Sequence, residues 1–149
     1  MSILIKNGHV ADPLTGRNGI YDVLVADGRI EKVEKEIRAD AEKVIDAGGC
    51  YVMPGFIDLH VHLRYPVLEY KETLDTGVKS AANVGITTIC AMPNTKPVID
   101  TGGKVAEVHR RAILESPVNV IQIGAVTKGQ DGQDLSDIRG MAQAGCRAI

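Results

Sequence analysis

The fold is decided by residues 54–64, which read Pro-Gly-Phe-Ile-Asp-Leu-His-Val-His-Leu-Arg. Proline and glycine punctuate the chain just before an apolar run, and this pattern predicts a buried strand. Side chains alternate across a strand, so Asp58, His60, His62 and Arg64 share one face if the extended conformation persists. The aliphatic residues between them would then pack against helices on the opposite face of a parallel sheet.

Downstream of this strand, helix and strand patterns alternate. The sequence predicts a helix over 73–84, a strand over 86–91, a second helix over about 103–114 and a third strand over 118–125. We expect a third helix that is capped by Asp134 or Ser136 and ends at Ala144, followed by a fourth strand that begins at 146–149. A strand and a helix that recur about every 30 residues indicate parallel βα units, either doubly wound or closed as a barrel.

The first third of the chain has a different pattern. Short aliphatic runs alternate with turn dipeptides, namely Asn7-Gly8, Asp12-Pro13, Asn18-Gly19 and Asp27-Gly28. The last of these predicts a hairpin between residues 21–25 and 29–33, and a further strand is expected over 43–45. We therefore expect residues 1–50 to form a small, incomplete β-domain, and residues 51–149 to form three to four βα units. Because a complete (β/α)8 barrel needs about 250 residues, such a barrel would be truncated here.

The composition is that of a globular, water-soluble protein. The 149 residues are 44% hydrophobic and 24% charged, with 17 basic and 19 acidic side chains. No long single-sign run and no apolar run of about 18 residues occurs, so we expect neither a nucleic-acid nor a membrane partner, and a cytoplasmic location. Cys50, Cys90 and Cys146 form no CxxC pair and are expected to be reduced, buried packing residues.

Two histidines form the central candidate site. His60 and His62 stand at i and i+2 on one strand face, where two imidazoles can bind a single cation with Zn–N distances of about 2.0–2.1 Å. The alternative is a pair of core or substrate-contacting histidines without metal. Asp58 shares their phase and could accept a ring proton from one of them, or could instead make an ordinary hydrogen bond to the backbone. His9 and His109 are expected at the surface.

Arg64 and Asn94 are the candidate substrate-binding residues. The guanidinium of Arg64 offers a planar fork for a carboxylate, and the alternative is a salt bridge to Glu69 or Glu72. Asn94 stands in a loop bracketed by prolines after the second predicted strand, where a fixed amide could hold a substrate. Its alternative role is an Asx turn. The polar loop at 128–134 follows the third strand and is expected to be solvated.

These motifs resemble a known family. Residues 54–64, followed by Ala-Met-Pro-Asn-Thr-Lys-Pro at 91–97, are similar to the amidohydrolase superfamily and, within it, to bacterial type I dihydroorotases. Residues 3–8 and 27–30 resemble the N-terminal β-domain of that superfamily, so the likeness spans essentially the whole chain. The resemblance implies the N-terminal part of a (β/α)8 metal-dependent hydrolase barrel preceded by a small β-domain.

The resemblance also implies a chemistry. One or two zinc ions would be bound, with His60 and His62 on the more buried ion, and Arg64 and Asn94 would hold the carboxylate of dihydroorotate. The reaction implied is the reversible cyclisation of N-carbamoyl-L-aspartate to (S)-dihydroorotate in pyrimidine biosynthesis. The family's bridging ligand and acid–base aspartate would lie beyond Ile149, so we expect no catalytic residue within the chain and no activity from it alone. The implied partners are the small-molecule substrate and, as alternatives, a second copy of the chain or aspartate transcarbamoylase.

Two other functions stay open. Hydantoinases and allantoinases resemble the same HxH pattern but usually carry an aspartate where Arg64 stands, so the arginine favours a ring with a free carboxylate. A non-catalytic dihydroorotase-like subunit that scaffolds aspartate transcarbamoylase would not need His60 and His62. The sequence departs from the dihydroorotases at Tyr65-Pro66-Val67, where they commonly have Glu-Pro-Gly, and this change affects the geometry of the loop after the arginine.

Overall fold

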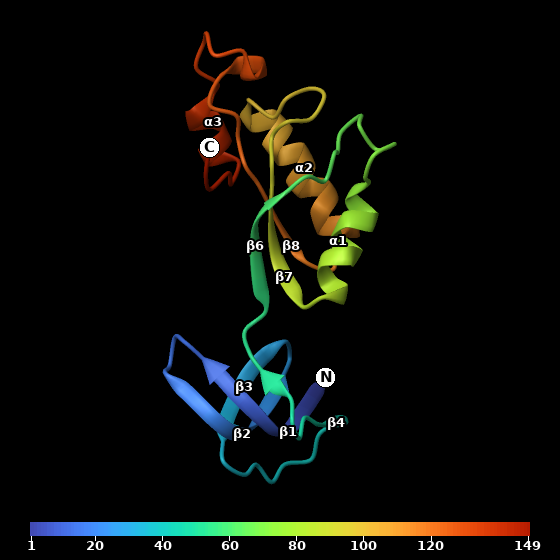
Figure 1. Ribbon diagram of the computed structural model, residues 1–149, viewed down its shortest axis with the longest axis vertical. Helices are drawn as coiled ribbons and strands as arrows, with labels where there is room; N and C mark the ends of the chain where they lie inside the picture. Colours follow the sequence, from blue (N-terminus) through green and yellow to red (C-terminus); the bar gives the residue numbers. More distant parts are fainter. The chain divides into compact units, whose positions relative to one another are not determined.

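The computed structural model describes residues 1–149, which divide into two compact units, Met1–Pro54 and Gly55–Ile149 (Figure 1). Unit 1 is built from five strands, which are β1 (Ser2–Asp12), β2 (Arg17–Ala26), β3 (Arg29–Glu34), β4 (Lys43–Asp46) and β5 (Tyr51–Val52). They form one sheet in the order β3-β2-β1-β4, and β5 also pairs with β1. The first three strands are antiparallel, whereas β4 and β5 run parallel to β1.

Not all the turns predicted at dipeptides of unit 1 are present in the structure. The hairpin predicted at Asp27-Gly28 is confirmed, and both residues have the positive φ that tight hairpin turns require, 49° and 74°. The turn predicted at Asn7-Gly8 is wrong, because these residues lie inside β1 at a shift of register, with Asn7 at φ 61°. Asn18-Gly19 likewise lies within β2. Asn and Gly tolerate the left-handed region, and this tolerance serves a β-bulge as well as a turn.

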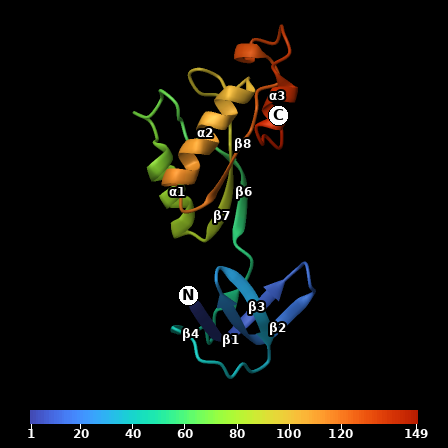
Figure 2. The ribbon, with the colours of Figure 1, turned by 180° about the vertical axis from the view of Figure 1, so that it is seen from behind.

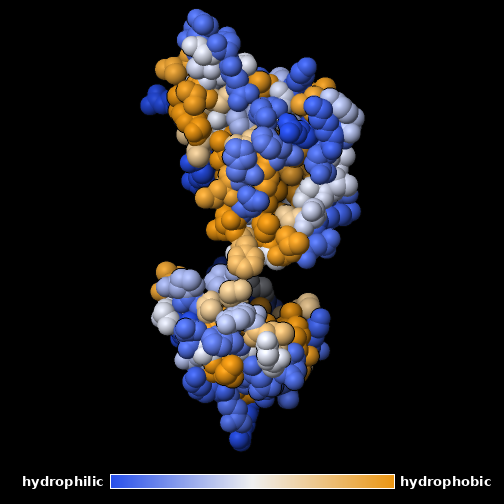
Figure 3. Space-filling view, in the orientation of Figure 1, coloured by the Kyte–Doolittle hydropathy of each residue, from blue (hydrophilic) through white to orange (hydrophobic).

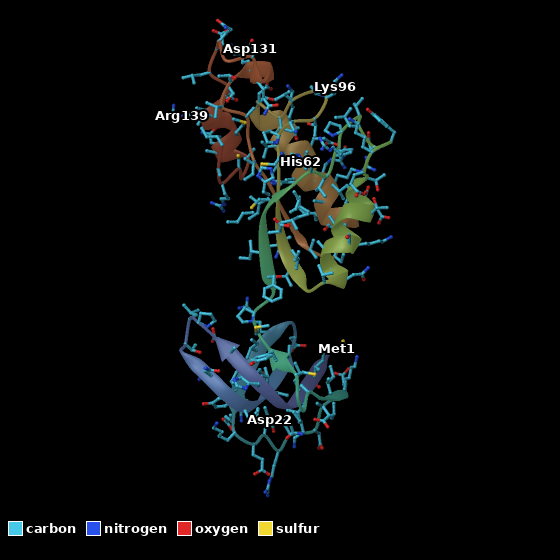
Figure 4. All side chains as sticks on the ribbon, viewed as in Figure 1. Met1, Asp22, His62, Lys96, Asp131 and Arg139 are labelled. Atoms are coloured by element: carbon cyan, nitrogen blue, oxygen red, sulfur yellow. The ribbon has the colours of Figure 1, made fainter.

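The buried carboxylate of Asp22 links the bulge in β1 to the loop that follows β3. Asp22 is 2% exposed and accepts hydrogen bonds from the backbone N–H groups of Asn7 (2.9 Å) and Ile37 (3.0 Å). The ammonium of Lys6 lies 3.8 Å away. Burial alone would raise the pKa of Asp22, but the two N–H groups and the lysine outweigh it and hold that pKa below the usual value. Figure 4 labels this residue within the strands of unit 1.

Unit 2 is a parallel sheet with helices. Its elements are β6 (Phe56–Val61), α1 (Leu74–Asn83), β7 (Ile86–Ala91), α2 (Gly102–Glu115), β8 (Asn119–Gln122), the 3-10 helix η1 (Lys128–Gln130) and α3 (Ile138–Gln143). The strands pair in the order β6-β7-β8, all parallel. Both views of the ribbon show α1 and α2 along the same face of this sheet (Figures 1 and 2). The predicted series of parallel βα units is therefore confirmed.

The boundaries of α1 follow from local chemistry. Thr73 is the N-cap, and its side chain accepts a hydrogen bond from the Thr76 N–H at 3.0 Å in a capping box. Gly85, with φ 80°, follows the end of the helix. The apolar stripe of α1 packs into a core between the sheet and the two helices. This core is made of Leu63, Leu74, Val78, Ala81, Ile89, Ala91 and Ala112. The helix predicted over 73–84 is thus confirmed to within a residue at each end.

The end of unit 2 differs from the prediction. The N-cap of α3 is Asp137, whose Oδ1 accepts from the Gly140 N–H at 2.9 Å, so the caps predicted at Asp134 and Ser136 are wrong. Ser136 is buried and donates to the carbonyl of Ala125. The third strand is shorter than expected, and residues 146–149 form no strand, although the Gly124 N–H donates to the Ala148 carbonyl at 3.0 Å.

A second core holds α2 against α3. It comprises Ile99, Val105, Val108, Met141 and Cys146.

The three cysteines differ in burial. Cys146 and Cys90 are buried, and burial raises the pKa of the Cys90 thiol. Cys50 is exposed, so the expectation that all three cysteines are buried is wrong for Cys50. No helix combines the length and apolarity needed to cross a membrane.

Candidate metal and substrate site

The strand that carries the histidines ends earlier than the sequence pattern suggests. β6 ends at Val61, its register against β7 shifts twice, and Arg64 has φ 60°, so the extended phase expected from residue 56 to residue 64 is wrong. Leu63 is buried in the core beneath α1, but Ile57 and Leu59 are 61% and 72% exposed instead of packed against helices. Figure 3 shows apolar residues gathered on the face of unit 2 that β6 presents in Figure 1.

His60 and His62 lie beside each other at the carboxyl end of β6. Their ring centroids are 5.1 Å apart, with an interplanar angle of 71°. Two imidazoles bound to one tetrahedral zinc, each with its centroid about 3.2 Å from the ion, have centroids roughly 5 Å apart. The centroid separation of the pair therefore matches that of two imidazoles on one such ion. No third His, Cys, Asp or Glu joins it, so these residues supply two ligands and not a complete set.

Asn94 contacts one of the two histidines. Its Oδ1 lies 2.9 Å from Nδ1 of His62, across 32 residues of sequence. Figure 4 labels His62 just above the end of β6, close to the strand β7 that leads to Asn94. Two residues that the sequence places in separate motifs, one for metal and one for substrate, are thus joined by a hydrogen bond.

Asp58 binds the backbone and not a histidine ring. Its Oδ1 accepts from the backbone N–H of His60 at 3.0 Å, which is the plainer of the two roles open to it. The side chain also lines a cavity of about 220 Å³ between β6 and α1, together with His62 and Glu72. Asp58 therefore stiffens the part of β6 that carries His60.

Arg64 makes no ion pair within the chain. Neither Glu69 nor Glu72 is paired with it, and Glu72 instead accepts hydrogen bonds from the hydroxyl of Thr76 and the N–H of Thr73. The guanidinium therefore keeps all its donors available to a ligand. The departure from the dihydroorotase pattern continues at Val67, whose φ of 73° is rare for a β-branched residue.

Two residues that matter for this end of the sheet were missed by the sequence reasoning. His109 is half-buried and not at the surface: its Nε2 accepts from the Gln122 N–H at 3.0 Å, and its Nδ1 lies 3.2 Å from the Ala144 carbonyl. It therefore bridges α2, β8 and the end of α3. A histidine between charged neighbours on a helix gives no sequence signal for such a bridge.

Asp100 is the second missed residue. Its carboxylate binds the ammonium of Lys104 at 2.6 Å and the backbone N–H of Gly129 at 2.9 Å. Burial raises the pKa of Asp100, but these two partners outweigh it and lower the pKa below the usual value. The loop predicted to be merely solvated, residues 128–134, is exposed but is anchored to the rest of unit 2 by this carboxylate.

Solved structures define the class to which this arrangement belongs. The L-hydantoinase (dihydropyrimidinase) from Arthrobacter aurescens matches 98% of this chain and 32% of its own, at 30% identity with a TM-score of 0.85. The dihydropyrimidinase from Brevibacillus agri matches 88% and 28%, at 28% identity and a TM-score of 0.72. The expected class is confirmed: the fold is that of the N-terminal part of a (β/α)8 hydrolase barrel preceded by a small β-domain.

Within this class the chain belongs to the dihydro-orotase-like family, whose model matches residues 49–149. It is similar to the dihydroorotase of Syntrophotalea carbinolica, with 47% identity over the whole chain and 35% of the relative. It is equally similar to the dihydroorotase of Acetivibrio thermocellus, with 48% identity over 99% of the chain and 34% of the relative. The chain thus spans about a third of the length of these curated relatives.

Proposed function

We propose that this chain provides the N-terminal part of a zinc-dependent dihydroorotase, which interconverts N-carbamoyl-L-aspartate and (S)-dihydroorotate in pyrimidine biosynthesis. The observation that carries the proposal is the contact between the two candidate sites, in which the histidine pair at the end of β6 meets Asn94 from the loop after β7. Relatives named dihydroorotase, at 47% and 48% identity, support the same reading.

In this proposal two residues bind metal and two bind the substrate. His60 and His62 hold one zinc ion through ring nitrogens, while Arg64 and Asn94 bind and orient the free carboxylate of the ring. Bound zinc supplies an acidified water and polarisation of the amide carbonyl, so that water can attack an otherwise inert bond. One to two ions per complete site are expected. The remaining ligands and the acid–base residue would come from chain outside residues 1–149, and we expect this chain alone to be inactive.

Two other readings remain as competitors. A hydantoinase-like hydrolase of uncharged rings is favoured by the TM-score of 0.85 to an L-hydantoinase, but a ring without a carboxylate would leave the guanidinium of Arg64 without a partner. A non-catalytic subunit that scaffolds aspartate transcarbamoylase would leave His60 and His62 without a role. The partners we propose are the small-molecule substrate and, as alternatives, a second copy of the chain or aspartate transcarbamoylase. We place the protein in the cytoplasm, where the substrate of this reaction and reduced cysteines are expected.

The test joins this chain to the remaining two thirds of the Syntrophotalea carbinolica dihydroorotase and assays ring opening of dihydroorotate and of hydantoin. Arg64→Met should lose two charge-assisted hydrogen bonds, roughly 3 kcal/mol, and therefore raise KM for dihydroorotate about a hundredfold. Arg139→Met, an exposed arginine on α3, serves as the control and should change neither parameter.

Three measurements separate the readings. Metal analysis of the chimera should find zinc, and His60→Ala should reduce it, whereas His9→Ala in unit 1 should not. If Arg64→Met leaves KM for dihydroorotate unchanged, the assigned role of Arg64 is wrong. A chimera that folds like its parent yet binds no metal would favour the scaffold.

A further inference from the structure

We propose that Asn94 is a positioning residue that sets the tautomer of His62 and thereby selects Nε2 as the atom with which this histidine binds metal. Only the last step, metal binding by His62, rests on the proposed function. The tautomer itself is a property of this chain and can be measured without metal.

The argument starts from the donor and acceptor atoms. The Oδ1 of Asn94 is a carbonyl oxygen, which accepts hydrogen bonds and cannot donate them. It lies 2.9 Å from Nδ1 of His62, and this contact is a hydrogen bond in the tautomer whose Nδ1 carries the hydrogen. A neutral imidazole has one N–H and one lone pair, which leaves the lone pair on Nε2. Because metals bind the bare nitrogen, a partner of the other nitrogen decides which atom can be the ligand.

The position of Asn94 is fixed by the backbone and not by its own side chain. The Met92 N–H donates to the Val61 carbonyl at 2.9 Å, which ties the start of the loop to the end of β6. Thr95, 5% exposed, donates from its hydroxyl to the Pro97 carbonyl at 2.8 Å and from its N–H to the Pro93 carbonyl at 2.8 Å. Parallel pairing of β6 with β7 therefore delivers the Asn94 amide to His62 in a loop that is already ordered.

One amide can serve two partners at once. With Oδ1 engaged by His62, the Nδ2 of Asn94 makes no hydrogen bond within the chain, and the residue is exposed. Its two N–H groups remain available to a ligand carboxylate. A substrate held by Nδ2 would thus contact the same amide that orients the metal ligand. Arg64 has no such link, so the two substrate-binding candidates should differ in their effect on metal affinity.

The first experiment reads the tautomer in the metal-free chain. Long-range proton–nitrogen correlation spectra of the histidine-labelled chain, at mildly alkaline pH, distinguish a protonated ring nitrogen from a bare one. The spectrum of a His62→Gln variant, which lacks the His62 signals, assigns them. We expect a protonated Nδ1 and a bare Nε2 in the wild-type chain. A wild-type spectrum with the hydrogen of His62 on Nε2 would overturn the proposal whatever the Asn94 variants show.

Variants of Asn94 then test the cause. Asn94→Leu removes the acceptor and should release the ring into a mixture of tautomers, whereas Asn94→Asp keeps an acceptor and should retain the Nδ1–H form. An unchanged tautomer in Asn94→Leu would show that another group sets it. If the loop had only a structural role, Asn94→Asp would not be expected to keep the wild-type tautomer that Asn94→Leu loses.

The second experiment measures zinc affinity in the chimera by competition with a chelator. Loss of an orienting partner typically lowers metal affinity about tenfold to a hundredfold, so we expect this loss for Asn94→Leu, recovery for Asn94→Asp and no change for Arg64→Met. Zinc binding that is indifferent to Asn94→Leu would overturn the inference but leave the proposed function intact. A chimera that binds no zinc, with the tautomer as expected, would instead overturn the proposed function.

Discussion

Replacing Gly102 by alanine should destabilise the packing of α2 against α3. A Cβ on Gly102 would lie 2.5 Å from the carbonyl oxygen of Gly140 and 2.7 Å from its carbonyl carbon. Both atoms belong to the backbone, so no side-chain rotation can relieve the overlap and α3 must move as a whole. Overpacking of this kind costs about 1–3 kcal/mol. The neighbouring Gly103 has nothing within 4 Å of its Cβ position, so Gly103→Ala should be neutral or stabilise α2 by less than about 1 kcal/mol.

The assay is urea unfolding followed by circular dichroism, together with hydrogen exchange of the peptides that contain α3. Gly102→Ala should lower the free energy of unfolding and speed exchange in α3, and Gly103→Ala should do neither. Both variants add one methyl group to the same helix, so helix propensity cancels in the comparison. Equal stability of the two variants, within about 0.5 kcal/mol, would refute the argument from the Gly102–Gly140 contact.

Two further predictions concern buried polar groups. Asp22→Asn should destabilise unit 1 by about 1–3 kcal/mol at neutral pH, because Oδ1 accepts from Asn7 and Oδ2 from Ile37, whereas an amide keeps one oxygen and turns a donor toward the other N–H. The folded-state pKa of Asp22 is lowered, so this difference should be complete above the unfolded pKa of about 3.9 and should shrink as pH falls through the folded value, which urea titrations across pH would detect. His109→Leu should leave the Gln122 N–H without its acceptor and cost about 1–3 kcal/mol in the same assay; His9→Leu, on the sheet of unit 1, is its control.

The elements of unit 2 that depend on local chemistry could be predicted from the sequence. The helix over Leu74–Asn83 has its cap at Thr73 and its glycine at position 85, and both signals lie within the segment itself. The strand Ile86–Ala91 has the predicted bounds, because β-branched residues between a glycine and a proline-rich loop leave little choice. The third helix was predicted, with its end at Ala144, but its N-cap was not, because Asp134, Ser136 and Asp137 are all good caps and tertiary contacts select among them.

The sequence names the candidate residues of the site but does not indicate their geometry. His60 and His62 lie together as their spacing implies. The register shifts in β6 and the left-handed backbone of Arg64 depend on pairing with β7 and leave no mark on the alternation of residues. The hydrogen bond from His62 to Asn94 spans 32 residues, so it follows from the alignment of two strands and from no motif.

The parallel topology of unit 2 also determines how much chain entropy is lost when its strands pair. Ala26 pairs with Arg29 across a two-residue turn in unit 1, so that hairpin closes a very short loop. In unit 2 each strand pair is separated by a whole helix, as Thr88 opposite Asn119 illustrates. Closing a loop of about 30 residues costs roughly 3 kcal/mol before any contact is made. We therefore expect the meeting of His62 with Asn94 to be a late event in folding, because α1, which lies between β6 and β7 in the sequence, must first pack on the sheet.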